Sequence, residues 1–114
     1  MDQVTTVSTH RAVVQELLNR YLHERPIDPN VETQLIADLA QDHYQLVNVG
    51  WEGEHRVYGC VIHIDIKGDK IWIQHNMTEN LVAEDLVALG VPKEQIVLGL
   101  HSPFKRRFTE FALN

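Results

Sequence analysis

The sequence predicts an α+β fold made of an N-terminal helix, a four-stranded antiparallel meander, a second helix and an extended C-terminal tail. In two segments, apolar residues recur every three or four positions, which indicates helices with one buried side. Between these segments, apolar and polar residues alternate, which indicates strands with one face toward a core. A Gly-Asp pair between two alternating segments predicts a tight hairpin, so these strands run antiparallel.

The chain has the size of one domain. Its 114 residues include 44% apolar and 23% charged side chains, close to the averages of globular proteins. We find no internal repeat, low-complexity tract or long linker that would divide it. We therefore expect a single domain over residues 1–114, with residues 1–8 flexible.

The first helix is expected to begin at Ser8 or Thr9, both good capping residues, and to end near Glu24. Its buried side has the helical spacing and consists of Val13, Val14, Leu17, Leu18, Tyr21 and Leu22. Pro26 and Pro29 follow, and proline cannot continue the hydrogen-bond ladder of a helix.

Four strands are expected next. Residues 31–40 fit either a strand or a helix, and the alternating segments after them favour a strand. A turn at residues 42–43 separates them from a second strand over residues 44–51. Residues 56–66 carry the clearest alternation, with one face made of Tyr58, Cys60, Ile62, Ile64 and Ile66.

The Gly68-Asp69 turn fixes how residues 56–66 pair with residues 70–75, because a two-residue loop sets the register of a hairpin. On the apolar face it predicts the pairs Ile66–Ile71, Ile64–Ile73 and Ile62–His75. On the opposite face it predicts the pairs Asp65–Trp72 and His63–Gln74.

Thr78 is expected to cap the second helix, and Gly90 with Pro92 to end it. The buried side of this helix consists of Leu81, Val82, Leu86, Val87 and Leu89. Residues 96–100 fit a short strand or a buried extended segment. The tail carries Phe104, Phe108, Phe111 and Leu113, too much apolar surface for a free end. We expect the tail to pack back or to lie in an interface.

Charge and cysteine content narrow the classes of function. Ten Lys and Arg stand against 16 Asp and Glu, and the net charge of −6 opposes nonspecific binding to nucleic acid or to an anionic membrane. The one cysteine, Cys60, cannot form an internal disulfide, and we find no signal peptide or membrane-spanning stretch. We expect a cytoplasmic protein.

The polar residues do not specify an enzyme. No two of the seven histidines have the four-residue spacing of a helical metal site, and there is no Cys-x-x-Cys motif. His63 and Asp65 share a strand face but supply two ligands at most. Cys60 is expected on the core face, where a thiol ionises poorly. We therefore predict no catalytic residue, no metal site and no cofactor.

Two groups of residues are candidate contact sites for a protein partner. Trp51 and Trp72 are expected on the sheet face opposite the isoleucines, where an exposed aromatic patch marks an interface. The second group is a basic run between two phenylalanines, namely Phe104, Lys105, Arg106, Arg107 and Phe108. Arginine and aromatic residues are enriched at protein interfaces. The same run could stack bases and hold phosphates, or could form a tail with buried phenylalanines and exposed arginines.

The sequence resembles the XisI family, the fdxN-element excision controlling factors of cyanobacteria. The likeness covers nearly all of the chain after the first helix. Its most specific segments are Asp42-His43-Tyr44-Gln45-Leu46, Gly50-Trp51, Arg56-Val57-Tyr58-Gly59-Cys60, His63-Ile64-Asp65-Ile66-Lys67, Lys70-Ile71-Trp72-Ile73-Gln74, Thr78-Glu79, Leu89-Gly90-Val91-Pro92-Lys93, Ile96-Val97-Leu98-Gly99 and His101-Ser102-Pro103.

This resemblance implies a small α+β protein needed for programmed, site-specific excision of a DNA element during heterocyst differentiation. It implies an accessory factor that binds a XisH-like protein, while a separate recombinase exchanges the DNA strands. The family offers no catalytic residues to transfer, so we expect no enzyme.

Two other functions and one assembly state stay open. One function is a nucleic-acid-binding module centred on residues 105–107. The other is a metal-dependent hydrolase that uses His63, Asp65 and either His43 or His101. An uncovered second sheet face or tail would favour a homodimer.

Overall fold

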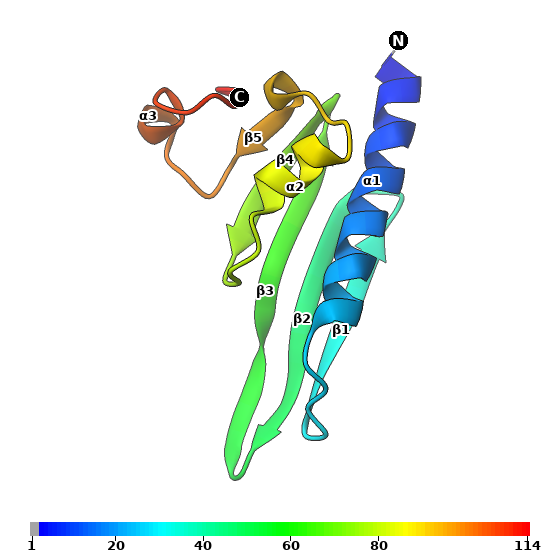
Figure 1. The fold of residues 1–114 in the computed structure, drawn as a ribbon, viewed down its shortest axis with the longest axis vertical. Coiled ribbons are helices and arrows are strands. Elements are labelled where there is room, and N and C mark those ends of the chain that lie inside the picture. Colours follow the sequence, from blue (N-terminus) through cyan, green and yellow to red (C-terminus); the bar gives the residue numbers. More distant parts are fainter. Residues whose placement is uncertain (1–2) are drawn as a thin grey trace.

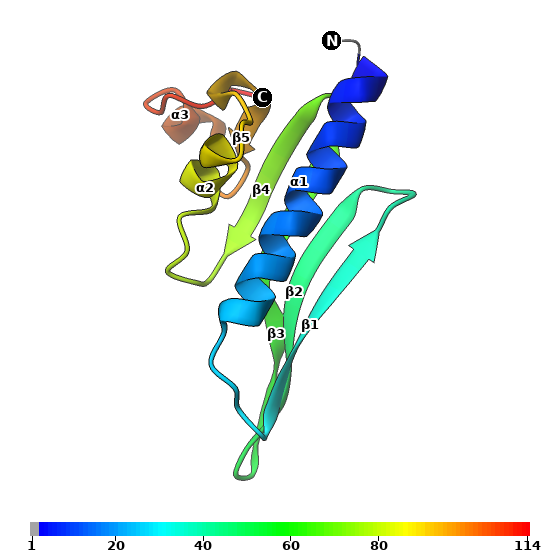
Figure 2. The same cartoon turned by 45° about the vertical axis from the view of Figure 1, so that its right-hand side comes forward.

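The computed structural model describes residues 3–114, which form one mixed sheet with α1 and α2 on the same face (Figure 1; Figure 2). The strands lie in the order β1-β2-β3-β4-β5; the first four pair antiparallel and β5 runs parallel to β4. The elements are α1 (Gln3–Glu24), β1 (Val31–Asp38), β2 (His43–Glu52), β3 (His55–Lys67), β4 (Lys70–Asn76), α2 (Val82–Ala88), the 3-10 helix η1 (Lys93–Gln95), β5 (Ile96–Leu98) and α3 (Pro103–Arg106). The α+β class and the four-stranded antiparallel meander are confirmed.

The hydrophobic core lies between the sheet and the two helices. Val14, Leu17 and Leu18 from α1 meet Leu86 from α2, and all four are fully buried. Their spacing places them on one side of each helix. The inward sheet face adds Tyr44, Leu46, Ile62, Ile64, Ile71, Ile73 and Ile96. Burial of a side chain of this size contributes about 1.5–3 kcal/mol to folding.

α1 begins at Gln3, earlier than the predicted cap at Ser8 or Thr9. Its first turns extend because they have tertiary contacts: Thr6 and His10 are buried, and Val7 packs against the core. Residues 3–8 therefore belong to the helix, where we expected a flexible segment. Residues 1–2 of that segment lie outside the described residues.

A β-bulge changes which side chains of β3 face the core. The partner of β2 jumps from Ile62, opposite Leu46, to Cys60, opposite Val47. A shift of one residue turns the side chains beyond it to the other face of the sheet. Tyr58 is accordingly exposed and Cys60 is half-buried outside the core cluster. The prediction that placed both on the isoleucine face is wrong.

A second bulge lies between His63 and Ile64, in the pairing of β3 with β4. The predicted pairs next to the Gly-Asp turn are confirmed, namely Ile66–Ile71, Asp65–Trp72 and Ile64–Ile73. Beyond the bulge His63 pairs with His75 and Ile62 with Asn76, so the predicted pairs Ile62–His75 and His63–Gln74 are wrong. The turn sets the register only as far as the first irregularity.

α2 begins at Val82, later than the predicted cap at Thr78. The Oδ1 of Asn76 accepts hydrogen bonds from the backbone N–H and the hydroxyl of Thr78, and the Oγ1 of Thr78 accepts one from the N–H of Asn80. These side-chain bonds hold the segment in turns and compete with a first helical turn. Leu81 is exposed as a result, so its predicted place in the buried stripe is wrong.

The C-terminal tail packs back on the molecule, as predicted, but it is not wholly extended. Ser102 caps the short helix α3 by accepting a hydrogen bond from the backbone N–H of Lys105. Further on, the N–H of Ala112 donates to the carbonyl of Ile96, and a bridge joins Ala112 to Val97 beside β5. The tail thereby extends the sheet past β5 and helps to bury Val97.

Candidate functional site

The sheet face directed away from α1 and α2 stays open across β1, β2 and β3 in the part of the chain that the structure describes (Figure 1; Figure 2). The predicted contact residues lie in two groups near opposite ends of this long molecule, which measures 48 × 30 × 24 Å: Trp51 is next to the β2–β3 turn, and Trp72 is beside residues 104–108. The β2–β3 turn forms one end, and α3 lies toward the other (Figure 1). The two groups therefore do not form one patch.

At α3, two phenylalanines and an arginine form an exposed group that we call the aromatic cluster: Phe104, Arg107 and Phe108. The rings of Phe104 and Phe108 meet edge to face, with centroids 5.4 Å apart. The guanidinium of Arg107 lies 5.0 Å and 5.8 Å from the two ring centroids. Phe104 is 63% exposed and Phe108 is 72% exposed. The alternative of buried phenylalanines and exposed arginines is therefore wrong.

Arg106 points the other way and holds the tail in place. Its Nε donates hydrogen bonds to the carbonyls of Leu98 (3.1 Å) and His101 (3.0 Å), and its Nη1 donates to the carbonyl of Leu113 (3.3 Å). Its guanidinium also lies 5.2 Å from the centroid of the Trp72 ring. Because these contacts are internal, Lys105 and Arg107 are the outward cations of the basic run.

Trp72 and Trp51 have different surroundings. Trp72 is half-buried between Arg106 and Lys67, whose Nζ lies 4.4 Å from the ring centroid. Trp51 is exposed near the β2–β3 turn, and Arg56 of β3 lies over both Trp51 and Tyr58, at 5.2 Å and 5.8 Å from their centroids. Trp51 thus belongs to a second aromatic and arginine group at the far end of the sheet.

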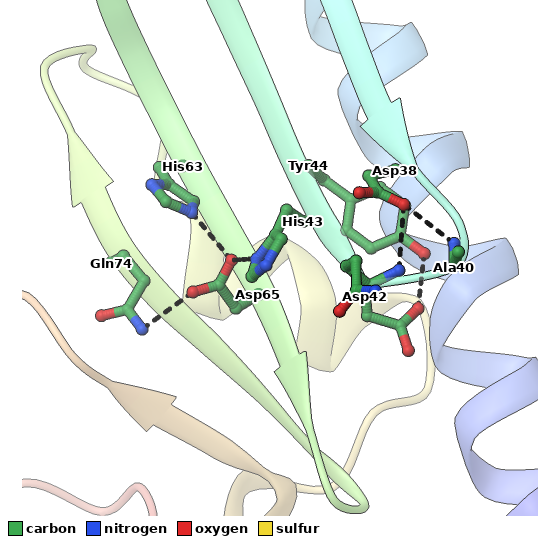
Figure 3. A network of polar contacts seen from close by, with 9 residues as sticks. Asp38, Ala40, Asp42, His43, Tyr44, His63, Asp65 and Gln74 are labelled. Carbon is green, nitrogen blue, oxygen red and sulfur yellow. Dashed lines mark hydrogen bonds and ion pairs between the residues drawn. The ribbon is translucent and has the colours of Figure 1, made fainter.

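On the open face, three potential metal ligands lie together in what we call the His-Asp cluster: His43, His63 and Asp65 (Figure 3). His43 begins β2 directly opposite Asp65 of β3, and His63 lies two residues before Asp65 on the same face. The Nδ1 of His43 and the Nε2 of His63 each lie 2.7 Å from the Oδ1 of Asp65. The Nε2 of Gln74, from β4, donates a hydrogen bond to the Oδ2 of Asp65 at 3.1 Å.

The carboxylate of Asp65 is held in its charged form. Its side chain is only 12% exposed. Burial alone would raise the pKa of Asp65, but hydrogen bonds from His43, His63 and Gln74 outweigh burial and lower the pKa below its usual value. The hydrogen bond with Asp65 raises the pKa of His43, and the charges of Asp65, Asp38 and Asp42 add to the shift. The cluster therefore has an electrostatic field that favours cations.

A turn before β2 positions His43. The Oδ1 of Asp38 accepts hydrogen bonds from the backbone N–H groups of Ala40 and Gln41, and Asp42 adopts a left-handed conformation with φ of 59° (Figure 3). Aspartate tolerates this conformation because its short side chain can bond locally. Arg11 of α1 binds the Asp42 carboxylate through Nε and Nη2, at 2.8 Å and 3.1 Å. The helix thereby fixes the turn from which His43 projects.

Residues 1–113 match the family described as XisI protein. The chain belongs to the XisI family. Two crystal structures from Anabaena variabilis resemble this XisI-family chain. A XisI-like protein is 48% identical with a TM-score of 0.89, over 94% of this chain and 98% of its own. The fdxN element excision controlling factor XisI is 32% identical with a TM-score of 0.82, over 99% of this chain and 100% of its own.

A comparison of this XisI-family chain with curated proteins gives no match. Among residues 3–114, no helix is long and apolar enough to cross a membrane.

The sequence of this XisI-family chain predicts only part of the His-Asp cluster as neighbours, namely His63 and Asp65. His63 and Asp65 were identified as a pair on one strand face, and the prediction of no metal site rested on their offering two ligands. His43, which we assigned to a turn, supplies the third. The predicted meander could have indicated this contact, because an antiparallel meander places the start of its second strand, at His43, beside the end of its third strand, at Asp65. His101, the other residue considered, is not among the clustered ligands of the described residues.

Proposed function

We propose that this XisI-family protein controls excision of a DNA element by binding a XisH-like protein, and that it does not itself cut or join DNA. Membership of the family supports a role in excision, since one similar structure is that of an fdxN element excision controlling factor. The family resemblance suggests the XisH-like partner, and the surface of this chain supports a contact with a protein.

The aromatic cluster of α3 is the observation that carries the proposal. Phe104 and Phe108 expose most of their area to solvent, and Arg107 stacks on both. Large exposed aromatic side chains cost solvation free energy in an isolated protein, whereas at an interface they and arginine give much of the binding energy. The cluster is therefore the best candidate for the centre of a protein contact.

Charge favours a protein partner over direct binding to DNA. The net charge is −6. Of the three cations in the basic run, Arg106 is not available to bind phosphate, because it donates hydrogen bonds to the backbone carbonyls of Leu98 and Leu113. Nonspecific affinity for DNA grows with the number of phosphates neutralised. Lys105 and Arg107 offer two such contacts.

Titration of the purified XisH-like protein into this chain, followed by calorimetry, tests the proposal. We expect the double substitution Phe104→Ala and Phe108→Ala to weaken binding by about 2 kcal/mol or more, which is the range of interface hot spots. Arg107→Glu should weaken it as well, while Arg25→Glu, the same charge change on the loop after α1, should leave it unchanged.

Trp51→Ala separates the two ends of the molecule. If Trp51→Ala alone weakens binding, the partner contacts the β2–β3 turn and the assignment to α3 is wrong. If the XisH-like protein does not bind the unaltered chain at all, the proposed function is contradicted. Binding to duplex DNA that declines steeply with salt and is lost in Lys105→Glu would support the nucleic-acid-binding module in its place.

A further inference from the structure

We propose that the His-Asp cluster is a binding site for a divalent transition metal of the zinc class. The site uses the Nδ1 of His43, the Nε2 of His63 and a carboxylate oxygen of Asp65 (Figure 3). It is independent of the proposed binding of a XisH-like protein.

The distances between ligand atoms fit such an ion. The three ligand atoms all lie within 4.8 Å of one another, and both nitrogens are 2.7 Å from the same carboxylate oxygen. Tetrahedral zinc with bonds of about 2.0–2.1 Å places its ligands roughly 3.3 Å apart. Small side-chain rotations are therefore enough to seat an ion between the three residues.

The type of ligand selects the class of metal. Two imidazole nitrogens and one carboxylate oxygen suit zinc and neighbouring transition metals, whereas Mg²⁺ and Ca²⁺ prefer sites made of oxygen alone. When the ion binds, it takes the place of the two N–H groups that now point at Asp65. Each nitrogen then gives its lone pair to the metal: a neutral imidazole transfers its proton to its other ring nitrogen by exchange with solvent, and a doubly protonated one releases that proton to solvent.

The groups around Asp65 hold the ligand atoms in position before an ion binds. Asp65 is nearly buried and would be costly as a lone charge, so it needs compensating groups beside it. Gln74 fixes its second oxygen, the kind of outer contact that orients metal ligands. All four residues project from adjacent strands, which hold their positions more rigidly than loops do.

A fourth ligand can reach the His-Asp cluster from solvent. The side chain of His43 is 55% exposed and that of His63 is 29% exposed, and the cluster lies on the open face of the sheet. Three protein ligands with a fourth position open to water distinguish reactive or exchangeable zinc sites from closed structural ones. Water, or a ligand from a second molecule on this face, can complete the shell.

The test is calorimetric titration of tag-free chain with Zn²⁺, using Mg²⁺ as the control metal. We expect saturable binding of one Zn²⁺ per chain and none of Mg²⁺. His43→Ala, at an exposed position, should weaken zinc binding at least about tenfold. Gln74→Leu, which removes only the outer hydrogen bond, should weaken it by about 10–100-fold.

Matched histidine variants guard against nonspecific binding. His75→Ala removes the histidine that pairs with His63 across β3 and β4, and His55→Ala removes one beside the β2–β3 turn. Both should keep the affinity of the unaltered chain. Co²⁺ should give the visible absorption of a tetrahedral complex in the unaltered chain and lose it in His43→Ala.

Three results would overturn the inference. They are no saturable zinc binding to the unaltered chain, full affinity in His43→Ala, or equal loss of affinity in His55→Ala. Asp65→Asn tests the carboxylate and should also weaken binding. If Asp65→Asn does not fold, His43→Ala still decides the result.

Discussion

His10 shows how one buried residue ties stability to pH. It is 2% exposed, and its Nε2 donates a hydrogen bond to the carbonyl of Asp69 at 3.0 Å. The Nδ1 therefore carries the lone pair, and it is buried without a partner among the described residues. Burial lowers the pKa of His10 below the usual value, despite the opposing effects of Asp69 and of the Gln95 side chain.

Protonation of His10 therefore favours the unfolded chain, where histidine titrates near pH 6.5. Its contribution to stability is complete above that pH and declines as the pH falls toward the folded-state pKa. We expect His10 to lower the free energy of unfolding as the pH falls from about 7 to 5, so the change over that range should be less destabilising in His10→Gln. Urea denaturation at both pH values measures this, with the exposed His55→Gln as control. An equal drop in His10→Gln would contradict the assignment.

Gly50 stands where two segments of backbone meet. A Cβ placed on it would lie 2.1 Å from the carbonyl oxygen of Asn30 and 2.6 Å from the Cα of Val31. The next residue, Trp51, donates its N–H to that same carbonyl. At Gly59 on β3, an added Cβ meets nothing within 4 Å, so the two glycines form a matched pair.

We expect Gly50→Ala to lower the free energy of unfolding by about 1–3 kcal/mol, because backbone must move to admit the methyl group. Gly59→Ala should change it by less than about 0.5 kcal/mol in either direction. Chemical denaturation of both variants measures the difference. If Gly59→Ala is the more damaging, the close approach of β2 to the start of β1 is wrong.

At the scale of elements, Arg106 joins α3, β5 and the end of the tail. It bonds to backbone carbonyls on both sides of the helix and stacks on Trp72 of β4. A long side chain that satisfies several carbonyls fixes a segment that has little core of its own.

Arg106→Ala should therefore release the tail from β5. We expect a loss of about 1–3 kcal/mol, faster hydrogen exchange at the N–H of Ala112 and a change in Trp72 fluorescence. Lys105→Ala, its neighbour, is the control and should show none of these effects. Unchanged exchange at Ala112 in Arg106→Ala would show that other contacts hold the tail.

The same elements show what the sequence could and could not predict. Strong period-two alternation and the Gly-Asp turn predicted the pairs from Ile66–Ile71 to Ile64–Ile73 correctly, because local geometry sets them. The bulges beside Val47 and His63 left no local signal, so the faces of Tyr58 and Cys60 were reversed. The sequence could not decide between His43 and His101 as the third residue of the His-Asp cluster for a related reason, since both are distant in sequence from His63 and Asp65.

The helix ends followed tertiary contacts and side-chain bonds more than intrinsic preference. α1 continues back to Gln3 because its first turns are covered, and α2 starts late because Asn76 and Thr78 bond to the backbone of the turn before it. The parallel pairing of β5 with β4 is likewise a long-range feature. The exposure of Phe104 and Phe108 could not be predicted from an apolar tail alone, because the same residues would fill a core equally well.

At the scale of the whole molecule, the chain is elongated, acidic and open on one side. α1 and α2 cover one sheet face, exposed cations and aromatic side chains gather at α3 and at the β2–β3 turn, and the His-Asp cluster occupies the open face between β2 and β3. The surfaces proposed here for a protein and for a metal ion are therefore separate. The tests of the two sites are therefore independent.

The central claim is that this XisI-family chain works through a protein partner. Size-exclusion chromatography with light scattering, on the chain alone, the XisH-like protein alone and the two co-expressed, tests it most directly. We predict a single mixed species that contains both chains, and its loss when Phe104 and Phe108 are both replaced by alanine. Two species that elute separately at their own masses, with the unaltered chains, would contradict the claim.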